Sequence, residues 1–213
     1  MIKPGASVEP VPEDGRNRRR ANNRASIVSA FLALVREGVM MPSAQAVAEK
    51  AKVSPRTVFR CFQDMESLYR EIIVALRDEF VPRAYLDLST TDRRERLSLL
   101  VANRASVFED MTPFRLAAEA HRQHSPALSG DNDFLVAMER ERLVTVVNPD
   151  GALDAVRLEG LSAVTCFEFW LRLRREQGLE PADAAQVMRA AALAILDSGA
   201  DAGPVTEPGK MMQ

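Results

Sequence analysis

The sequence predicts an all-α protein of about nine helices arranged as two domains, and three observations support this. Apolar residues recur at helical three- and four-residue spacing through most of the chain. Strand signals are rare, since the lone hairpin-like dipeptide, Asp150-Gly151, lies between helical stretches. Charge also changes sign along the chain. Residues 16–80 carry 12 Lys and Arg against 7 Asp and Glu, whereas residues 81–213 carry 15 against 20. We therefore place the domain boundary near residue 80.

The two ends of the chain are expected to lie outside the folded domains. Residues 1–15 contain three prolines and no clear periodicity, which predicts a disordered arm. Residues 198–213 are similar and predict a flexible tail. The folded domains are then residues 16–80 and residues 81–197.

The first domain is expected to begin with a helix over residues 20–37. Gly38 is a suitable C-terminal stop because glycine adopts the left-handed conformation readily. The apolar face of this helix consists of Ile27, Phe31, Leu34 and Val35.

Two short helices and a long one are expected to follow. Ser43 is a good N-cap for the first, and Ser54, with Pro55 behind it, is a good N-cap for the second. The second short helix should end near Phe62, and the long helix should cover residues 64–80. The tight connection through Lys52 and Val53 makes the short pair a helix-turn-helix unit, so this domain is a three-helix helix-turn-helix domain followed by a fourth helix.

The second domain is predicted to hold five further helices. Thr112-Pro113 and Glu180-Pro181 resemble helix starts, and Gly178 resembles a helix end. The predicted helices lie near 92–109, 112–123, 131–147, 151–177 and 181–197.

The outward face of the helix-turn-helix unit is chemically suited to DNA. Arginine pairs with guanine edges, while threonine and phenylalanine contact the thymine methyl group. Serines at helix N-termini and arginines in an arm before the first helix suit phosphates or the minor groove. The alternative is an ordinary helical hairpin with exposed polar residues. The residues expected to contact double-stranded DNA are Arg19, Arg20, Ser43, Ser54, Arg56, Thr57, Phe59, Arg60 and Gln63.

Residues 24–80 resemble the DNA-binding domain of the TetR/AcrR family of transcriptional regulators. The residues that carry the resemblance are Val47, Ala48, Ala51, Val53, Ser54, Thr57, Phe62, Glu66 and Leu68. It implies a homodimeric repressor that a small-molecule ligand releases from a palindromic operator. Four positions depart from the family pattern: Lys52 replaces glycine, Phe59 replaces tyrosine, Cys61 replaces histidine and Met65 replaces lysine.

The last two predicted helices are apolar on nearly every side. A helix of that kind is buried against more than one neighbour. We therefore expect a homodimer joined through the helices at 151–177 and 181–197 as a four-helix bundle, which the resemblance also implies. The alternative is one large monomeric core.

The resemblance also implies a ligand pocket in the second domain. Arg104 is the candidate partner for an anionic ligand, although a salt bridge is an equal alternative, and Glu168 is expected to pair with Arg172 or to meet a cationic ligand. We expect only about half of the candidates to touch a ligand, the rest being core. The candidate lining residues are Leu100, Arg104, Val107, Phe108, Phe114, Phe134, Met138, Phe167 and Trp170.

Several functional classes are disfavoured. No run of 18 apolar residues predicts a membrane span, and there is no secretory signal pattern. Two cysteines and two histidines give little basis for a disulfide framework or a metal site, so we expect a cytoplasmic protein without cofactors. No catalytic constellation is evident, which disfavours an enzyme. The remaining alternative is a helical protein-interaction module that does not bind DNA.

Overall fold

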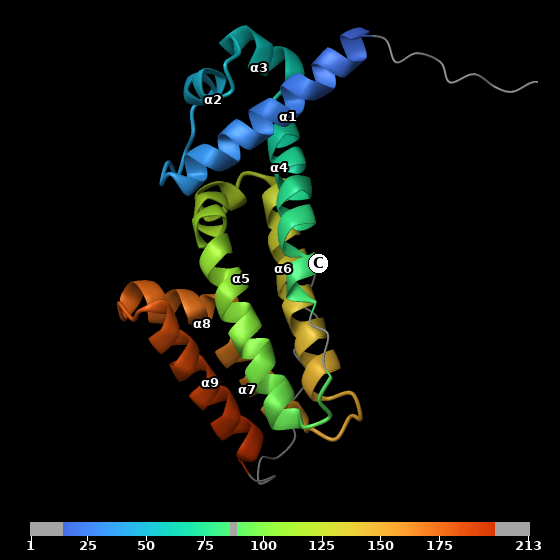
Figure 1. Ribbon diagram of the computed structural model, residues 1–213, viewed down its shortest axis with the longest axis vertical. Helices are drawn as coiled ribbons and strands as arrows, with labels where there is room; N and C mark the ends of the chain where they lie inside the picture. The colour runs from blue at the N-terminus through green and yellow to red at the C-terminus, as the bar shows by residue number, and fades with distance from the viewer. Residues whose placement is uncertain (1–14, 86–88, 199–213) are drawn as a thin grey trace, which may run out of the picture. The chain divides into compact units, whose positions relative to one another are not determined.

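The computed structural model describes residues 15–85 and 89–198, apart from the side chain of Arg16. Over these residues it contains nine α-helices, one 3-10 turn and one π turn, and no strand (Figure 1). The predicted all-α class is confirmed. The arm expected at residues 1–15 lies outside the described residues except for Gly15, and so does the tail except for Ser198.

The chain forms two compact units that divide between Glu71 and Ile72, inside a helix. The sequence placed the boundary at residue 80, where that same helix ends. The first unit contains α1 (Gly15–Arg36), α2 (Ala44–Lys50), α3 (Pro55–Cys61) and the beginning of α4 (Met65–Phe80).

The first unit is held together by the apolar face predicted for α1. Ile27 and Val35 are fully buried, and α1 packs against both α2 and α3. Phe31 meets Tyr69 of α4 edge to face, with ring centroids 6.4 Å apart. The short helices contribute Val47, Ala48, Val58 and Phe62 to the same core. This packing gives two short helices a fixed support, because neither is long enough to be stable alone.

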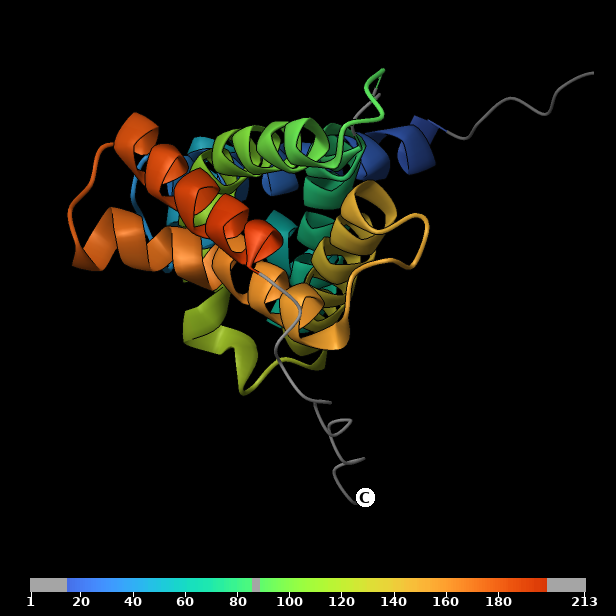
Figure 2. The same cartoon turned by 90° about the horizontal axis from the view of Figure 1, so that it is seen from below.

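The second unit is a bundle built around its longest helix. Figures 1 and 2 show α5 lying against α6 on one side and against α9 on the other, with α9 also packed on α7. Its elements are η1 (Pro82–Ala84), α5 (Arg93–Arg122), α6 (Pro126–Val147), α7 (Ala155–Thr165), α8 (Phe167–Leu171), the π turn η2 (Arg172–Glu176) and α9 (Pro181–Asp197), together with the last part of α4.

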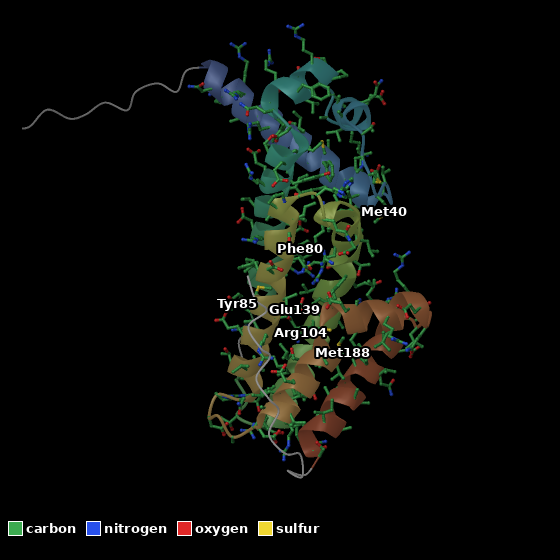
Figure 3. The ribbon with its side chains drawn as sticks, turned by 180° about the vertical axis from the view of Figure 1, so that it is seen from behind. Met40, Phe80, Tyr85, Arg104, Glu139 and Met188 are labelled. Carbon is green, nitrogen blue, oxygen red and sulfur yellow. The ribbon has the colours of Figure 1, made fainter. Side chains whose placement is uncertain are left out.

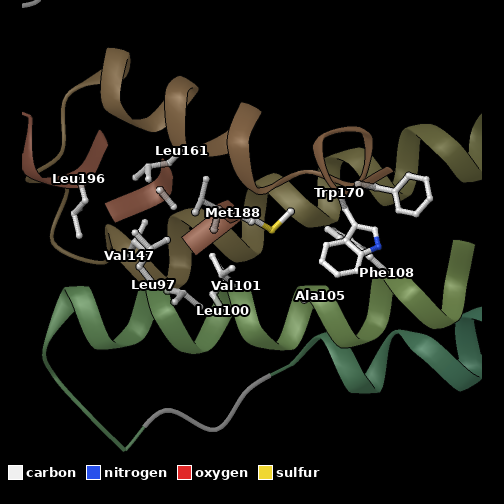
Figure 4. Close-up of a cluster of buried hydrophobic side chains, with 14 of the residues drawn as sticks. Leu97, Leu100, Val101, Ala105, Phe108, Val147, Leu161, Trp170, Met188 and Leu196 are labelled. Atoms are coloured by element: carbon white, nitrogen blue, oxygen red, sulfur yellow. The ribbon is translucent and has the colours of Figure 1, made fainter. Parts of the chain in front are cut away.

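The core of the second unit lies where α5, α7 and α9 meet. Leu97, Leu100 and Val101 of α5 face Leu161 and Met188 in Figure 4. The indole of Trp170 is completely buried in the same cluster. This shared core explains why the last helices of the chain are apolar on several sides.

The prediction of two helices at 92–109 and 112–123 is wrong, because α5 runs without interruption through Pro113. Proline has no N–H to donate to the carbonyl four residues earlier, so a break was expected there. The Thr112 hydroxyl donates to the Phe108 carbonyl at 2.7 Å, and this carbonyl is next to the one that an N–H at position 113 would have bonded. Burial of Met111 and Phe114 on either side keeps the helix in register.

The prediction of one long helix at 151–177 is also wrong. The backbone leaves the helix at Cys166, where φ is −81° and ψ is 168°, and separates α7 from α8. The helix expected at 131–147 begins earlier, at Pro126, because the Ser125 hydroxyl caps its first turn. The helix expected at 181–197 is confirmed by α9. Within the described residues, no helix is both long enough and apolar enough to cross a bilayer.

Candidate functional site

The turn between α2 and α3 has a well-defined geometry. The Ser43 hydroxyl accepts the Ala46 amide at 3.1 Å and caps α2. The Val53 amide then donates to the Ala48 carbonyl at 3.0 Å, and the Lys52 amide donates to the Glu49 carbonyl at 3.1 Å. This pair of bonds is a Schellman motif, which requires a left-handed residue at its centre.

Lys52 is that left-handed residue, with φ at 56°. The replacement of glycine by Lys52 left two possibilities open in the sequence, a left-handed backbone or a different turn, and the structure has the left-handed backbone. A side chain with a Cβ pays about 1–2 kcal/mol for left-handed backbone. The helix-turn-helix unit therefore folds despite a local cost that glycine would avoid.

α3 begins as the sequence predicts. The Ser54 hydroxyl accepts the Thr57 amide at 3.2 Å and lies 3.0 Å from the Thr57 hydroxyl, with Pro55 in the first turn. Both Ser43 and Ser54 thus use their hydroxyl oxygens as helix caps, while the serines themselves remain exposed. The Ser43 hydroxyl keeps a proton that it can donate to an outside acceptor, whereas the Ser54 hydroxyl shares a hydrogen bond with the Thr57 hydroxyl in which either oxygen can donate.

α3 has one buried face and one exposed face. Val58 and Cys61 are about 4% exposed and face the core. Because successive residues of a helix are about 100° apart, Arg56, Phe59 and Arg60 share an arc of about 100° on the opposite side. All three residues are exposed, and the exposed fraction of Phe59 is 66%. Thr57 is half-buried, and Gln63 is exposed just beyond the helix end. We name the arc of Arg56, Phe59 and Arg60 the recognition face.

The sequence suggested that Arg19 and Arg20 lie in an arm before the first helix, and that prediction is wrong. They lie within α1, which begins at Gly15, and both are exposed. The Arg19 Nε donates to the Gly15 carbonyl at 3.0 Å, so the first turn of the helix is closed by its own arginine. Their side chains are therefore presented by a helix rather than by a flexible segment.

Arg24 joins three helices of the first unit, a role that no sequence pattern indicated. Its guanidinium lies over the Phe62 ring and its Nε donates to Glu71 Oε1 at 2.7 Å. Its Nη1 donates to the Cys61 carbonyl at the end of α3. One side chain on α1 thus fixes both the end of α3 and the first turns of α4.

An apolar hollow of about 210 Å³ lies beside the recognition face. Its walls come from α2, α3 and the start of α4, and Met65 on its edge is 42% exposed. The lining residues are Pro42, Ala44, Val47, Val58, Phe59, Phe62, Gln63, Asp64, Met65 and Leu68.

The second unit contains a buried polar cluster at the α7–α8 break. Arg104 of α5 is 6% exposed and donates to the Thr165 carbonyl at 2.8 Å and to the Thr165 hydroxyl at 2.6 Å. It also donates to the backbone carbonyl of Glu139, and Figure 3 shows these two residues close together. Burial lowers the pKa of the Arg104 guanidinium, and the charge of Glu139 opposes that shift. The Arg104 guanidinium, which the sequence suggested as the partner of an anionic ligand, thus donates to acceptors within the protein.

Arg115 and Glu139 form the charged half of this cluster. Arg115 Nη1 donates to Glu139 Oε1 at 2.9 Å, and both side chains are about nine-tenths buried. Glu139 Oε2 accepts the Phe167 amide at 3.3 Å, and Arg115 lies 4.0 Å from the centroid of the Phe167 ring. Burial raises the pKa of the Glu139 carboxyl, while Arg115 and Arg104 oppose the shift. We call Arg104, Arg115 and Glu139 the break clamp, because they hold the residues on both sides of Cys166.

The expected pairing of Glu168 with Arg172 does not form. Glu168 accepts from Arg115 at 3.0 Å, and Arg172 lies 3.8 Å from Glu176 instead. Arg115 of α5 takes Glu168 as its partner, and Arg172 opens the π turn in which Glu176 also lies.

The structure brings together some of the expected pocket residues and separates others. Leu100, Phe108, Phe167 and Trp170 belong to one buried cluster, with Phe108 and Phe167 edge to face at 5.5 Å. Val107 is buried outside that cluster.

The other expected pocket residues lie elsewhere in the same unit. Phe114 is buried against Phe80 at 6.1 Å. Phe134 is 37% exposed under the Arg77 guanidinium, 3.8 Å from its ring centroid, and Met138 is half-buried. The nine residues therefore do not form one continuous lining.

Two further observations on the described part of the chain concern metal binding and the buried thiol. No group of three or more His, Cys, Asp or Glu side chains there is placed to hold a metal ion. Cys61 is 4% exposed, in keeping with a small buried apolar side chain.

Comparison with protein-family profiles and with curated proteins finds no match to the sequence. Solved structures match the fold, and two of them cover most of the chain. One is a transcriptional regulator from Rhodococcus sp. Rha1, with a TM-score of 0.56 and 15% identity, covering 83% of this chain and 95% of that one. The other is described as a TetR-family transcriptional regulator from Mesorhizobium loti, with a TM-score of 0.53 and 16% identity, covering 86% of this chain and 98% of that one. The chain therefore has the fold of TetR-family transcriptional regulators.

Proposed function

We propose that this protein is a DNA-binding transcriptional regulator that inserts α3 into the major groove. The observation that carries the proposal is the recognition face. Arg56, Phe59 and Arg60 are exposed on one side of a short helix whose other side is anchored in the core. An α-helix fits the major groove, and arginine is the residue that most often reads guanine there.

The distribution of charge along the chain also supports DNA binding by the first unit. Residues 16–80 are basic, whereas the chain as a whole carries a net charge of −2. Arg19 and Arg20 extend the positive surface along α1, and exposed arginines contribute to affinity by contacting phosphates. Ser43 and Ser54, each exposed at a helix start, are the proposed hydroxyl donors to phosphate.

We propose a homodimer through α7, α8 and α9, which cover the two helices that the sequence assigned to this role. α9 combines a buried face at Ala184 and Met188 with an exposed face of small residues at Ala190 and Ala194. Val187 on the same helix is 41% exposed. Small side chains allow helices to approach closely across a two-fold axis. Such a dimer presents two copies of α3, so its operator is a palindrome.

We further propose that a small-molecule effector bound among the apolar residues of the second unit releases the repressor from DNA. The candidate lining is the part of the predicted set that lies in one buried cluster, namely Leu100, Phe108, Phe167 and Trp170. An effector must bind the DNA-free form about 10⁴-fold more tightly to reverse occupancy from 99:1 to 1:99. An effector with equal affinity for both forms would contradict this part of the proposal.

The deciding experiment is selection of binding sites by the full-length protein from a random duplex DNA pool at two salt concentrations. We expect a palindromic site whose affinity falls steeply as salt rises, because bound phosphates release counterions. A folded protein that enriches no sequence and binds no duplex at low salt would refute the proposal. That result would favour the helical interaction module instead.

A further inference from the structure

Phe59 is the apolar member of an otherwise charged recognition face. Its side chain is 66% exposed, more than any other large apolar residue among those described. Val58 beside it is buried, so the exposure reflects the outward position of Phe59 on α3 rather than a loosely packed helix. An exposed aromatic ring beside two arginines is a feature that the first-unit core does not explain.

We propose that Phe59 reads the 5-methyl group of a thymine in each operator half-site. This inference rests on the proposed function, since it assumes that α3 enters the major groove. It specifies that one base pair of each operator half-site must present a thymine methyl group.

The chemistry of the side chain leaves few alternatives on a DNA surface. A phenyl ring has no donor for a phosphate oxygen and no partner for the polar edges of guanine, adenine or cytosine. The apolar group that unmodified base pairs display in the major groove is the thymine methyl. Contact with that methyl removes apolar surface of both partners from water.

The position of the ring on α3 fits a contact with a base edge. Arg56 precedes Phe59 by three residues and Arg60 follows it by one, so the ring shares its arc with two side chains suited to guanine. The apolar hollow adjoins the ring, with Phe62 and Met65 also in its wall. A methyl group placed against Phe59 therefore meets an apolar surface that extends beyond the ring itself.

The test uses the full-length protein and the duplex obtained by selection from the random pool. Each thymine of that duplex is replaced in turn by uracil, which removes the 5-methyl group and keeps every hydrogen-bonding atom. Affinity is measured by fluorescence anisotropy for the wild type and for Phe59→Ala. We expect uracil at one position of each half-site to weaken the wild type about fourfold per half-site, or about 16-fold when both are replaced. Phe59→Ala should bind the thymine and uracil duplexes equally.

Two matched variants separate the ring from general effects. Phe59→Leu keeps an apolar side chain and should retain part of the uracil effect. Val74→Ala truncates another exposed apolar residue, 58% exposed on α4, and should retain all of it. Circular dichroism spectra of the four proteins confirm that each is folded before affinities are compared.

Three outcomes would overturn the inference, and they differ from failure of the proposed function. If no single uracil weakens the wild type, the ring contacts sugar or backbone instead. If Phe59→Ala keeps the full uracil effect, another residue, such as Thr57, reads the methyl group. If both proteins bind only with uniform, salt-dependent affinity, there is no thymine-specific contact. A wild type that binds no duplex at any salt concentration refutes the proposed function itself, and this inference with it.

Discussion

The guanidinium of Arg24 lies 4.4 Å from the centroid of the Phe62 ring, where α3 ends. The same group bonds Glu71 on α4 and the carbonyl of Cys61. Arg24 thus bonds both the end of α3 and α4, although it lies on α1 and outside the helix-turn-helix unit.

Arg24→Ala should destabilise the first unit by about 1–3 kcal/mol. The change removes a cation–π contact and leaves the Cys61 carbonyl without its guanidinium partner. Urea denaturation followed by circular dichroism measures the loss. Arg20→Ala, an exposed arginine on the same helix, is the matched control and should change stability by less than about 0.5 kcal/mol. Equal stabilities for the two variants would show that the Arg24 contacts contribute nothing.

Lys52→Gly should stabilise the protein by about 0.5–1 kcal/mol. Glycine removes the cost of φ at 56°, and its larger entropy in the unfolded chain cancels part of the gain. Thermal denaturation provides the measurement. Lys50→Gly, at the last residue of α2, should have the opposite sign, since glycine disfavours a helix and the ion pair of Lys50 with Glu37 is lost. A destabilised Lys52→Gly variant would mean that the lysine side chain contributes more than its backbone costs.

Arg60→Ala and Arg20→Ala should weaken DNA binding in different ways. Loss of a guanine contact by Arg60 should relax sequence preference at one position of the half-site and cost about 1–3 kcal/mol there. Loss of a phosphate contact by Arg20 should weaken all sequences equally and reduce the salt slope by about 0.9 per contact. Affinities on selected and mismatched duplexes at four salt concentrations separate the two effects. Identical behaviour of the two variants would contradict a guanine contact by Arg60.

Ala194→Arg should convert the proposed dimer to a monomer. A charged side chain on the exposed small face of α9 would be buried without a partner if that face is the interface. Sedimentation velocity at micromolar concentration provides the measurement. Ala102→Arg, at an exposed alanine of α5, should leave the dimer intact. A dimer that survives Ala194→Arg would place the interface on another surface.

The stability of the second unit should fall as pH rises above about 4.5 because of Glu139. Burial raises the pKa of this carboxyl, so the folded state holds its proton more tightly than the unfolded chain does. Folding is then favoured below the ordinary carboxyl pKa, and that advantage is lost as pH rises through the raised value. Asp131, whose pKa burial also raises despite its bond to Arg77, acts in the same direction.

Glu139→Gln isolates that contribution. The variant cannot ionise at this position, so its unfolding free energy should vary less with pH than that of the wild type. Urea midpoints between pH 4 and pH 8 provide the comparison. Parallel pH profiles for the two proteins would show that Glu139 keeps an ordinary pKa in the fold.

The first unit could be predicted from the sequence because its signals are local. Ser43, Ser54 and Pro55 fix two helix starts through bonds within four residues. Lys52 stands where the turn requires a left-handed residue, and the structure has φ at 56° there. Arg24 escaped prediction because its partners are distant in sequence and nothing distinguishes it from the exposed arginines before it.

The second unit was harder to predict because its irregular features depend on distant contacts. Pro113 is a local stop signal, yet burial of Met111 and Phe114 keeps α5 continuous. Cys166 carries no stop signal, yet Arg104 and Glu139 hold the backbone groups on its two sides. Arg115 and Glu139 are ordinary charges in the sequence, and only packing of α5 against α6 buries them together.

The interruption at Cys166 restricts how the length of this protein can change during evolution. One inserted or deleted residue in α7 would rotate Thr165 by about 100° and carry its carbonyl away from the α5 side chain that binds it. The same change would displace the Phe167 amide from α6. Insertions should instead be accepted around Gly151 and Gly178, whose left-handed turns separate helices at the surface. The break clamp thus fixes the residue spacing between α7 and α8 relative to α5 and α6, while the neighbouring turns are free to vary in length.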